Sequence, residues 1–391
     1  MRNAFRLILA LLLTANVIAQ TDIGVVDVKK GGDAIPVSVT AYSPEMLNLA
    51  QTALNTHGRL RLVASGGSYG INFVSAGPNG VKVILTRSGS DVLTQTVSGS
   101  SPRNALLKAA DVAVNKITGL PGYFAGKLAF VGERTGKTEI YTSDLFFGDL
   151  FKWTSDGKQV LSPRWAPDGS RVVYTSYRSS FPDIYVVDFG ARRVSLLASF
   201  KGTNSGGRFS PDGSRLAMVL SGEGNPEVYV GNAQARQLKR LTNNQSVEAS
   251  PTFSPDGSRV LFVSDAPGRP QLFVMPAGGG AMTRLPTNIS SYCAEPDWSA
   301  ADPSKIAFTA AVGKGYQIAV YDQKAGASKI ASQAPMDAVE ATWLADGRHV
   351  VCTFRSANVR TLYILDTESG KATRLSPQSF GNASSASYLA P

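Results

Sequence analysis

The segment Gly207–Met218, GRFSPDGSRLAM, decides the fold, because versions of it recur along the last two-thirds of the chain. Each version holds an aromatic residue, then a tight turn, usually centred on Asp-Gly, and then an apolar run. The aromatic anchors are spaced 44, 44, 45 and 45 residues apart: Trp165, Phe209, Phe253, Trp298 and Trp343. A fixed period of this length indicates a repeat architecture in which every unit is one supersecondary structure.

A second motif, an apolar strand pattern that usually ends in Asp, follows each turn. It occurs six times, and the copies begin at Glu139, Asp183, Glu227, Gln271, Gln317 and Thr361. The turns are chemically specified, because Pro presets one dihedral, Asp can bond its own backbone and Gly accepts a positive φ. Four short strands in a unit of about 40 to 50 residues are typical of a propeller blade. We therefore predict an all-β, six-bladed propeller over residues 126–391.

The two ends of the repeat predict how the ring closes. The first unit opens at Gly126–Phe130 and has no aromatic-turn strand before it, whereas one period beyond Trp343 lies Tyr388, close to the end of the chain. We expect the last residues to supply the innermost strand of the first blade. This pairing would cover two strand edges that are otherwise exposed.

Residues 20–125 lack the repeat and predict a small α/β domain. Two helices are bounded by capping signals: one begins at Ser43-Pro44 and ends at Gly58, and the other begins at Ser101-Pro102 and ends at Gly119. Alternating apolar patterns predict strands near 23–30, 35–42, 60–64, 71–76, 81–88 and 91–98.

The first residues predict export. Arg2 and Arg6 precede an apolar run from Leu7 to Leu13, which is too short to cross a bilayer. We expect a signal peptide over residues 1–19, cleaved between Ala19 and Gln20, and a periplasmic protein. The formal net charge of +10 is spread along the chain among acidic residues, which does not indicate a nucleic-acid groove.

The repeat resembles that of the TolB propeller family, and Ile117–Glu133 resembles the junction between the amino-terminal domain and the first blade in that family. The stretch between the strands at 60–64 and 71–76 is shorter than is usual there. The resemblance implies a periplasmic adaptor of the Tol-Pal envelope system that supports envelope integrity and outer-membrane constriction at division. It implies neither enzymatic activity nor a cofactor, and we expect a monomer that does not span the membrane.

The resemblance also implies two partner sites. The propeller face that carries the outer-to-inner connections would bind a peptidoglycan-associated lipoprotein, Pal, and an amino-terminal arm would bind the inner-membrane protein TolA. Mixed charges with a few aromatic or Met residues on loops suit protein recognition. The candidates on the face are Lys201, Arg208, Glu248, Tyr292, Glu295, Met336, Asp337 and Glu340, joined by Arg178, Arg269, Lys314 and Arg355 from the other loop set. The candidates on the arm, within residues 21–33, are Thr21, Asp22, Ile23, Val25 and Asp27; an ordinary edge strand is the alternative for this arm.

Several residues suggest chemistry but fit structural roles better. Gly66–Gly70 matches a nucleophile elbow around Ser68, yet a strand pattern follows instead of a helix, so we predict a hairpin turn. The only histidines, His57 and His349, and the only cysteines, Cys293 and Cys352, show no metal-ligand spacing. Two separate buried thiols are favoured over a bridge. We expect the turn aspartates to form those turns rather than bind calcium: Asp168, Asp212, Asp256 and Asp346. We expect the tryptophans to pack between blades: Trp165, Trp298 and Trp343.

Two other function classes stay open. A secreted propeller enzyme acting on peptide or carbohydrate would need clustered carboxylates near the channel, for which Glu248, Glu295, Asp337 and Glu340 are the candidates. A stand-alone envelope binding module would keep the pair of domains without the Tol-Pal partners.

Overall fold

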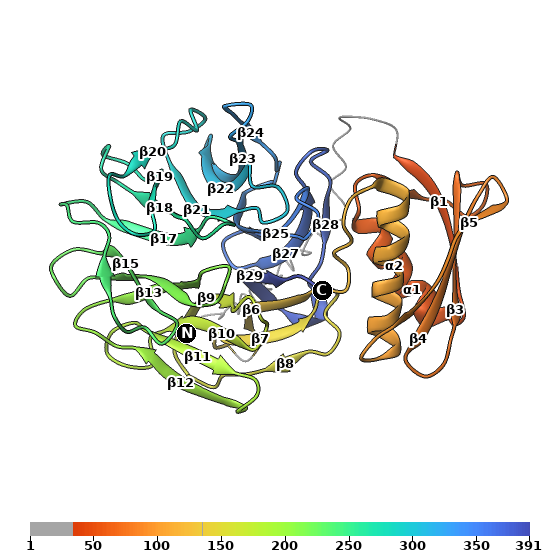
Figure 1. Ribbon diagram of the computed structural model, residues 1–391, viewed down its shortest axis with the longest axis horizontal. Coiled ribbons are helices and arrows are strands. Elements are labelled where there is room, and N and C mark those ends of the chain that lie inside the picture. Colours follow the sequence, from red (N-terminus) through yellow and green to blue (C-terminus); the bar gives the residue numbers. More distant parts are fainter. Residues whose placement is uncertain (1–33, 135) are drawn as a thin grey trace, which may run out of the picture.

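The structure, a computed structural model, describes residues 34–134 and 136–391 and shows a small α/β domain beside a six-bladed β-propeller (Figure 1). The predicted fold class is confirmed. The signal peptide 1–19 with its cleavage point, the strand predicted at 23–30 and the arm residues within 21–33 lie outside the described residues. Neither helix of the described chain is long and apolar enough to span a membrane.

The α/β domain is a five-stranded sheet in the order β2-β1-β3-β4-β5 with two helices packed on it. β1 pairs in parallel with both β2 and β3, whereas β3, β4 and β5 pair antiparallel. The strands are β1 (Ile35–Ala41), β2 (Leu60–Leu62), β3 (Tyr69–Ser75), β4 (Gly80–Arg87) and β5 (Ser90–Ser98).

The helices begin and end at the predicted signals. In α1 (Pro44–Thr56) the Ser43 hydroxyl accepts a hydrogen bond from the Met46 amide at 3.2 Å, and in α2 (Pro102–Thr118) Ser101 caps the Asn104 amide in the same way. α2 ends at Gly119, whose φ of 74° is left-handed and therefore suits glycine. The apolar faces of both helices are buried in one cluster with the sheet.

The segment around Ser68 does not form the predicted hairpin turn. β2 and β3 lie on opposite sides of β1, and Leu62 at the end of β2 and Tyr69 at the start of β3 both align with Val37. The segment therefore crosses over β1 at the level of Val37. A parallel pair flanking one strand cannot be joined by a hairpin, which is why the local turn signal misled.

Each blade is an antiparallel four-stranded sheet, written here from the innermost strand to the outermost. Blade 1 contains β29 (Asn382–Leu389), β6 (Lys127–Glu133), β7 (Glu139–Asp144) and β8 (Phe151–Lys152); blade 2, β9 (Val160–Trp165), β10 (Arg171–Ser176), β11 (Asp183–Asp188) and β12 (Arg193–Ala198); blade 3, β13 (Asn204–Phe209), β14 (Arg215–Leu220), β15 (Glu227–Asn232) and β16 (Lys239–Arg240). Blade 4 contains β17 (Glu248–Phe253), β18 (Arg259–Ser264), β19 (Gln271–Pro276) and β20 (Thr283–Arg284); blade 5, β21 (Cys293–Trp298), β22 (Lys305–Val312), β23 (Gly315–Asp322) and β24 (Ala327–Ile330); blade 6, β25 (Asp337–Trp343), β26 (His349–Arg355), β27 (Arg360–Asp366) and β28 (Ala372–Arg374). A short 3₁₀ helix, η1 (Gln378–Phe380), precedes β29.

The ring closes as predicted. β29, the last strand, pairs antiparallel with β6, the first propeller strand, from Asn382 opposite Glu133 to Leu389 opposite Lys127. Trp165 of blade 2 donates its indole N–H to the Ser387 carbonyl at 3.1 Å, so the closing strand also contacts the next blade.

The predicted structural roles of the turn residues and tryptophans are confirmed. In the turn between the two inner strands of blade 3, Asp212 accepts the Ser214 amide at 3.1 Å, and Gly213 has a φ of 71°. Trp343 donates to the Asp297 carbonyl of the neighbouring blade at 3.0 Å. Cys293 and Cys352 are separate, buried free thiols, as expected.

Candidate functional site

Six backbone bulges surround the central channel, one on each innermost strand. At each bulge one residue has a left-handed φ of 50° to 68°, and only one of the six is glycine: Ser162, Gly206, Ser250, Glu295, Glu340 and Ser385. Side chains rarely adopt this conformation, and such backbone strain concentrates at functional sites. The channel is therefore the first candidate site.

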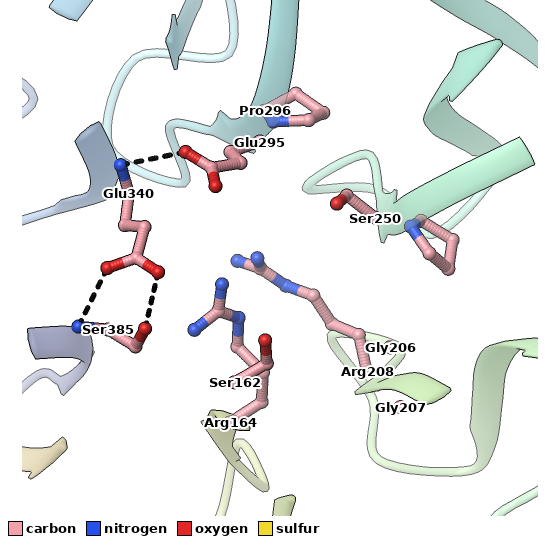
Figure 2. A pocket seen from close by; sticks show the side chains of 11 residues that line it. Ser162, Arg164, Gly206, Gly207, Arg208, Ser250, Glu295, Pro296, Glu340 and Ser385 are labelled. Carbon is pink, nitrogen blue, oxygen red and sulfur yellow. Dashed lines mark hydrogen bonds between the residues drawn. The ribbon is translucent and has the colours of Figure 1, made fainter. Parts of the chain in front are cut away.

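The channel wall carries opposite charges on opposite sides. Figure 2 shows Arg164 and Arg208, from blades 2 and 3, pointing into the channel toward Glu295 and Glu340, from blades 5 and 6. These four side chains line a narrow cavity of about 80 Å³. The two arginines therefore make one side of this constriction positive, and the two glutamates make the opposite side negative.

The two arginines have different partners. Arg208 forms an ion pair with Asp297, whose second carboxylate oxygen accepts the Trp343 amide at 2.8 Å. Arg164 donates to the Pro163 carbonyl at 2.9 Å, and within the described chain no carboxylate lies within 4.0 Å of it. Burial, and then the neighbouring charge of Arg208, lowers the pKa of Arg164 to about 10, so it stays a cation at neutral pH.

The two glutamates are held by hydroxyl and amide donors. Glu295 accepts the Thr309 hydroxyl at 2.7 Å and the Glu340 amide at 3.1 Å. Glu340 accepts the Ser385 hydroxyl at 2.5 Å and the Thr353 hydroxyl at 2.9 Å. Burial, followed by repulsion from Glu340, raises the pKa of Glu295 above its ordinary range. These carboxylates are fixed in place rather than free to reach a substrate.

Two wider cavities adjoin the constriction. One, of about 510 Å³, shares Glu340 and Ser385 with it and opens among the loops that carry Lys137 and Lys158. The other, of about 550 Å³, shares both arginines and is lined by the apolar turns between the two inner strands of several blades.

We call the side that carries the outer-to-inner connections and the loops between second and third strands the channel face. The structure places Lys201, Tyr292 and Met336 in connecting loops on this face, and Asp337 at the start of β25, where it pairs with Arg355 at 2.9 Å. Arg178, Arg269 and Lys314 are exposed there too. By contrast, Arg208, Glu295 and Glu340 lie within innermost strands, not in the loops where they were expected.

Glu248 is fully buried and therefore cannot touch a partner directly. Asn244 donates its side-chain amide to Glu248 at 3.1 Å and its backbone amide to Glu227 at 2.9 Å. Burial, and then the contact with Glu227, raises the pKa of Glu248 to about 7. Through its hydrogen bond with Asn244, Glu248 holds the loop at 241–247 in place.

The sequence reasoning missed most of the exposed apolar side chains of the channel face. Besides Met336, six large apolar residues are exposed in or directly beside its loops: Tyr177, Phe181, Phe200, Val247, Val312 and Ile330. Within the described residues, only Phe151 is exposed beside a turn of the opposite face. The sequence did carry a signal for these exposed residues, namely an aromatic residue inside a polar loop, as in Ser179-Ser180-Phe181.

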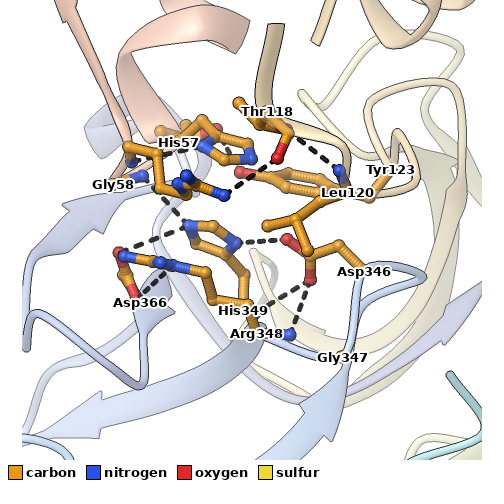
Figure 3. Close-up of polar contacts among 12 residues, drawn as sticks. His57, Gly58, Thr118, Leu120, Tyr123, Asp346, Gly347, Arg348, His349 and Asp366 are labelled. Atoms are coloured by element: carbon orange, nitrogen blue, oxygen red, sulfur yellow. Dashed lines mark hydrogen bonds and ion pairs between the residues drawn. The ribbon is translucent and has the colours of Figure 1, made fainter. Parts of the chain in front are cut away.

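The second candidate is a buried polar cluster between the two domains (Figure 3). His349 contacts Asp346 through Nδ1 at 2.5 Å and accepts the Gly58 amide at Nε2 at 3.0 Å. His57 lies beside it, and its Nε2 has no hydrogen-bond partner. Ligand atoms of His57, Asp346 and His349 lie within 4.8 Å of one another, a grouping that their sequence spacing did not predict.

This cluster serves the domain contact. Both nitrogens of His349 already have protein partners, and Arg348 pairs with Asp366 at 2.7 Å beside them. Lys371 donates to the Asn55 carbonyl at 2.7 Å, and Arg103 of α2 pairs with Asp144 of blade 1. A continuous apolar cluster also crosses the boundary, so the α/β domain is firmly packed on blades 6 and 1.

A closed six-bladed propeller with a charged channel, packed against a small α/β domain, defines a two-domain β-propeller protein. The sequence profile of the TolB beta propeller domain matches residues 114–388. The chain belongs to the TolB β-propeller family.

Known relatives agree with this assignment. The chain is 35% identical over 98 residues to the Tol-Pal system protein TolB of Azoarcus sp. (strain BH72), covering 25% of this chain and 23% of that protein. It is 36% identical over 110 residues to the protein of the same name in Cereibacter sphaeroides (strain ATCC 17025 / ATH 2.4.3), covering 27% and 25%. The matched segments thus span about a quarter of these curated relatives.

The structural likeness extends over both domains. The crystal structure of TolB from Acinetobacter baumannii superposes with a TM-score of 0.83 at 25% sequence identity, covering 93% of this chain and 98% of that one. The α/β domain and the propeller are thus arranged as in a TolB protein.

Proposed function

We propose that this protein is a periplasmic adaptor of a Tol-Pal-type envelope system, not an enzyme, and that its channel face binds a Pal-like peptidoglycan-associated lipoprotein. In this proposal the adaptor contributes to envelope integrity and to outer-membrane constriction during division. Membership of the TolB family and the names of the relatives support the choice of partner.

The uneven distribution of exposed apolar side chains carries the proposal. Seven of them lie in or directly beside the loops of the channel face, whereas among the described residues only Phe151 is exposed beside a turn of the opposite face. Met336, for example, is 55% exposed. Apolar side chains gathered on one rim of polar loops are the usual composition of a protein-binding surface.

The loops of this face are held in place, which suits binding without rearrangement. A residue at or near the start of the third strand of several blades accepts hydrogen bonds from the outer-to-inner connection of its own blade. Glu139 accepts the Thr154 hydroxyl at 2.5 Å, Glu227 accepts the Asn244 amide at 2.9 Å, and Gln317 accepts the Ala334 amide at 2.8 Å. A preformed surface loses less conformational entropy on binding.

The channel supports an adaptor better than a secreted enzyme. An enzyme of the alternative class needs carboxylates that can reach a substrate, but Glu248 is buried, Asp337 pairs with Arg355, and Glu295 and Glu340 are tied to hydroxyl and amide donors. The binding surface we propose therefore comprises the exposed loops together with the mouth of the channel. Lys201, Tyr292, Met336 and Asp337 belong to it, and Arg208, Glu295 and Glu340 form the channel wall beneath.

Membership of the TolB family also supports a second partner, a TolA-like inner-membrane protein. We propose that the arm within residues 21–33, through Thr21, Asp22, Ile23, Val25 and Asp27, binds a TolA-like inner-membrane protein. Deleting residues 21–33 should then abolish binding of the soluble carboxyl-terminal domain of that protein, while binding of the lipoprotein persists. Unchanged affinity for the inner-membrane protein would contradict this part of the proposal.

Amine cross-linking tests the channel face directly, because the chain has exposed lysines on several sides. We would cross-link intact envelopes, purify the tagged protein and map the joined lysines by mass spectrometry. We expect an OmpA-like, peptidoglycan-binding lipoprotein joined through the channel-face lysines Lys137, Lys158, Lys201 and Lys314. The outer-strand and turn lysines Lys152, Lys324 and Lys329 serve as controls. Recovery of no such lipoprotein, or links only through the controls, would overturn the proposal.

A further inference from the structure

Two phenylalanines stand out on the channel face at blade 2. Phe181, in the loop between β10 and β11, is 63% exposed, more than any other large apolar side chain of the described residues. Phe200, in the connection from β12 to β13, is 42% exposed. Single exposed apolar residues are ordinary on a protein surface, so a binding role needs further support.

One buried hydrogen-bond network holds both loops. The Asp183 carboxylate accepts the Ser179 hydroxyl at 2.6 Å from the first loop and the side-chain amide of Asn204, the first residue of β13 after the second loop, at 3.1 Å. Asn204 in turn bonds both the amide and the carbonyl of Phe200, at 2.8 Å and 2.9 Å, and the Ser179 hydroxyl also contacts the Phe181 carbonyl at 2.9 Å. The backbones of the two phenylalanines are therefore positioned as one unit.

Neighbouring loops brace this unit from both sides. The Tyr177 amide donates to the Gln159 carbonyl at 2.9 Å, and the Thr203 amide donates to the Ser221 hydroxyl at 2.8 Å. The two rings are thus displayed in solvent by a backbone that is already ordered. Aromatic side chains held in this way provide a large contact area at little entropic cost.

The border of the pair is basic. Arg178 and Lys201 are the exposed charges in the two loops. Of the nearby acids, the buried Asp156 partly balances Arg178 at 3.5 Å, whereas Glu223, from the adjoining loop of blade 3, pairs with Arg240 at 2.5 Å. Aromatic and arginine side chains together form the usual composition of an interface hot spot.

We propose that Phe181 and Phe200, held by Asp183 and Asn204, are the anchor through which the channel face grips its partner. The anchor fits a protein that presents an apolar recess bordered by carboxylates, because Arg178 and Lys201 flank the two rings. This inference rests on the proposed function and deepens it, since it places the main binding contacts on blade 2 instead of on the whole channel face.

The test compares two matched double variants of the full chain. Phe181→Ser with Phe200→Ser removes the anchor, and Phe151→Ser with Leu196→Ser removes two side chains of similar exposure, 50% and 54%, on outermost strands. The probe is the purified soluble domain of the peptidoglycan-associated lipoprotein from the same source, measured by biolayer interferometry. We expect the anchor variant to bind about 30-fold or more weakly and the control within about 2-fold of wild type. Arg178→Gln with Lys201→Gln should mainly slow association at low salt.

A photoreactive phenylalanine analogue placed at position 181, 200 or 336 separates the possible failures. The proposal expects cross-links to the lipoprotein from 181 and 200. Links only from 336, together with unchanged affinity of the anchor variant, would overturn this inference and leave the proposed function standing. Absence of binding by the folded wild-type protein would overturn both.

Discussion

His57 and His349, the only two histidines of the chain, face each other across the domain boundary with their ring centroids 4.7 Å apart. His57 belongs to the end of α1 and His349 to the start of β26 in blade 6. Both side chains are fully buried, and Tyr123 stacks on His57 with ring centroids 5.9 Å apart. A proton added to His57 would therefore place a charge in the buried boundary between the domains.

Acid should weaken the domain contact through His57. Burial, and then the neighbouring His349, holds the pKa of His57 well below its usual value near 6.5. Below about pH 6.5 the unfolded chain therefore binds a proton that the folded protein does not, and stability falls as the pH decreases. His57→Gln removes this titration. We expect the wild type to lose about 1 kcal/mol more than the variant between pH 7.5 and 5.5, as measured by urea unfolding.

Comparison with the variant is essential because three acids act in the opposite direction. Burial raises the pKa values of Asp111 and Glu248 to about 7 and also raises that of Glu295, so protonation of these groups stabilises the folded protein as the pH decreases. All three are present in wild type and variant alike and cancel in the difference. Equal pH slopes for the two proteins would show that His57 does not govern the contact.

Removing Asp297 should strongly destabilise the propeller. Its carboxylate pairs with Arg208 across the channel and accepts the Trp343 amide of the neighbouring blade. Asp297→Ala would leave a partly buried cation and a buried amide without partners, at a cost of about 3 kcal/mol. Asp168→Ala, in an exposed turn, should cost less than about 1 kcal/mol. Denaturant unfolding of both variants measures the difference, and similar losses would contradict the channel geometry.

Deleting residues 382–391 should open the ring. β29 would be lost, which exposes the edge of β6 and removes the contact of Trp165 with Ser387. Exposed strand edges associate with other chains, so we expect a lower melting temperature and soluble oligomers or aggregates in size-exclusion chromatography. Deleting only Ala390 and Pro391, which lie beyond β29, is the control and should leave both unchanged. A monomeric, equally stable deletion variant would refute closure by this strand.

The pKa of Glu295 should depend on the neighbouring Glu340. Burial, and then the charge of Glu340, raises the pKa of Glu295. Glu340→Gln removes the repulsion but not the burial, so the pKa of Glu295 should fall while staying above its ordinary value. Carbon-13 NMR of the carboxyl groups follows this titration. Glu45→Gln, exposed in the first turn of α1, should leave the Glu295 titration unchanged, and an equal shift in both variants would contradict direct coupling.

Most of the fold was predictable because every blade repeats the same chemistry. Turn residues such as Asp212 and Gly213 act locally, and their hydrogen bond and positive φ are those the sequence predicts. The closing strand followed from counting periods to Tyr388. The Ser68 segment was the exception, since strand order in a sheet depends on pairing between distant segments, and β2 and β3 pair with β1 instead of with each other.

The site was less predictable, for reasons of geometry. The bulges that place Glu295 and Glu340 in the channel wall need a left-handed φ at non-glycine residues, for which a sequence has no local signal. Glu248 looked like an exposed loop residue, but it is buried at the start of β17, where it contacts Asn244 of the preceding connection and Glu227 of the preceding blade. The contact of His57 with His349 depends on how the two domains pack.

Calorimetric titration of the purified protein with the soluble domain of the peptidoglycan-associated lipoprotein from the same source tests the adaptor most directly. We expect a one-to-one complex with a dissociation constant of about 1 μM or tighter, corresponding to about −8 kcal/mol. Phe181→Ser with Phe200→Ser, a change confined to exposed loops, should weaken this complex while the protein stays folded. Absence of binding by the folded wild-type protein at concentrations of about 100 μM would contradict the adaptor function.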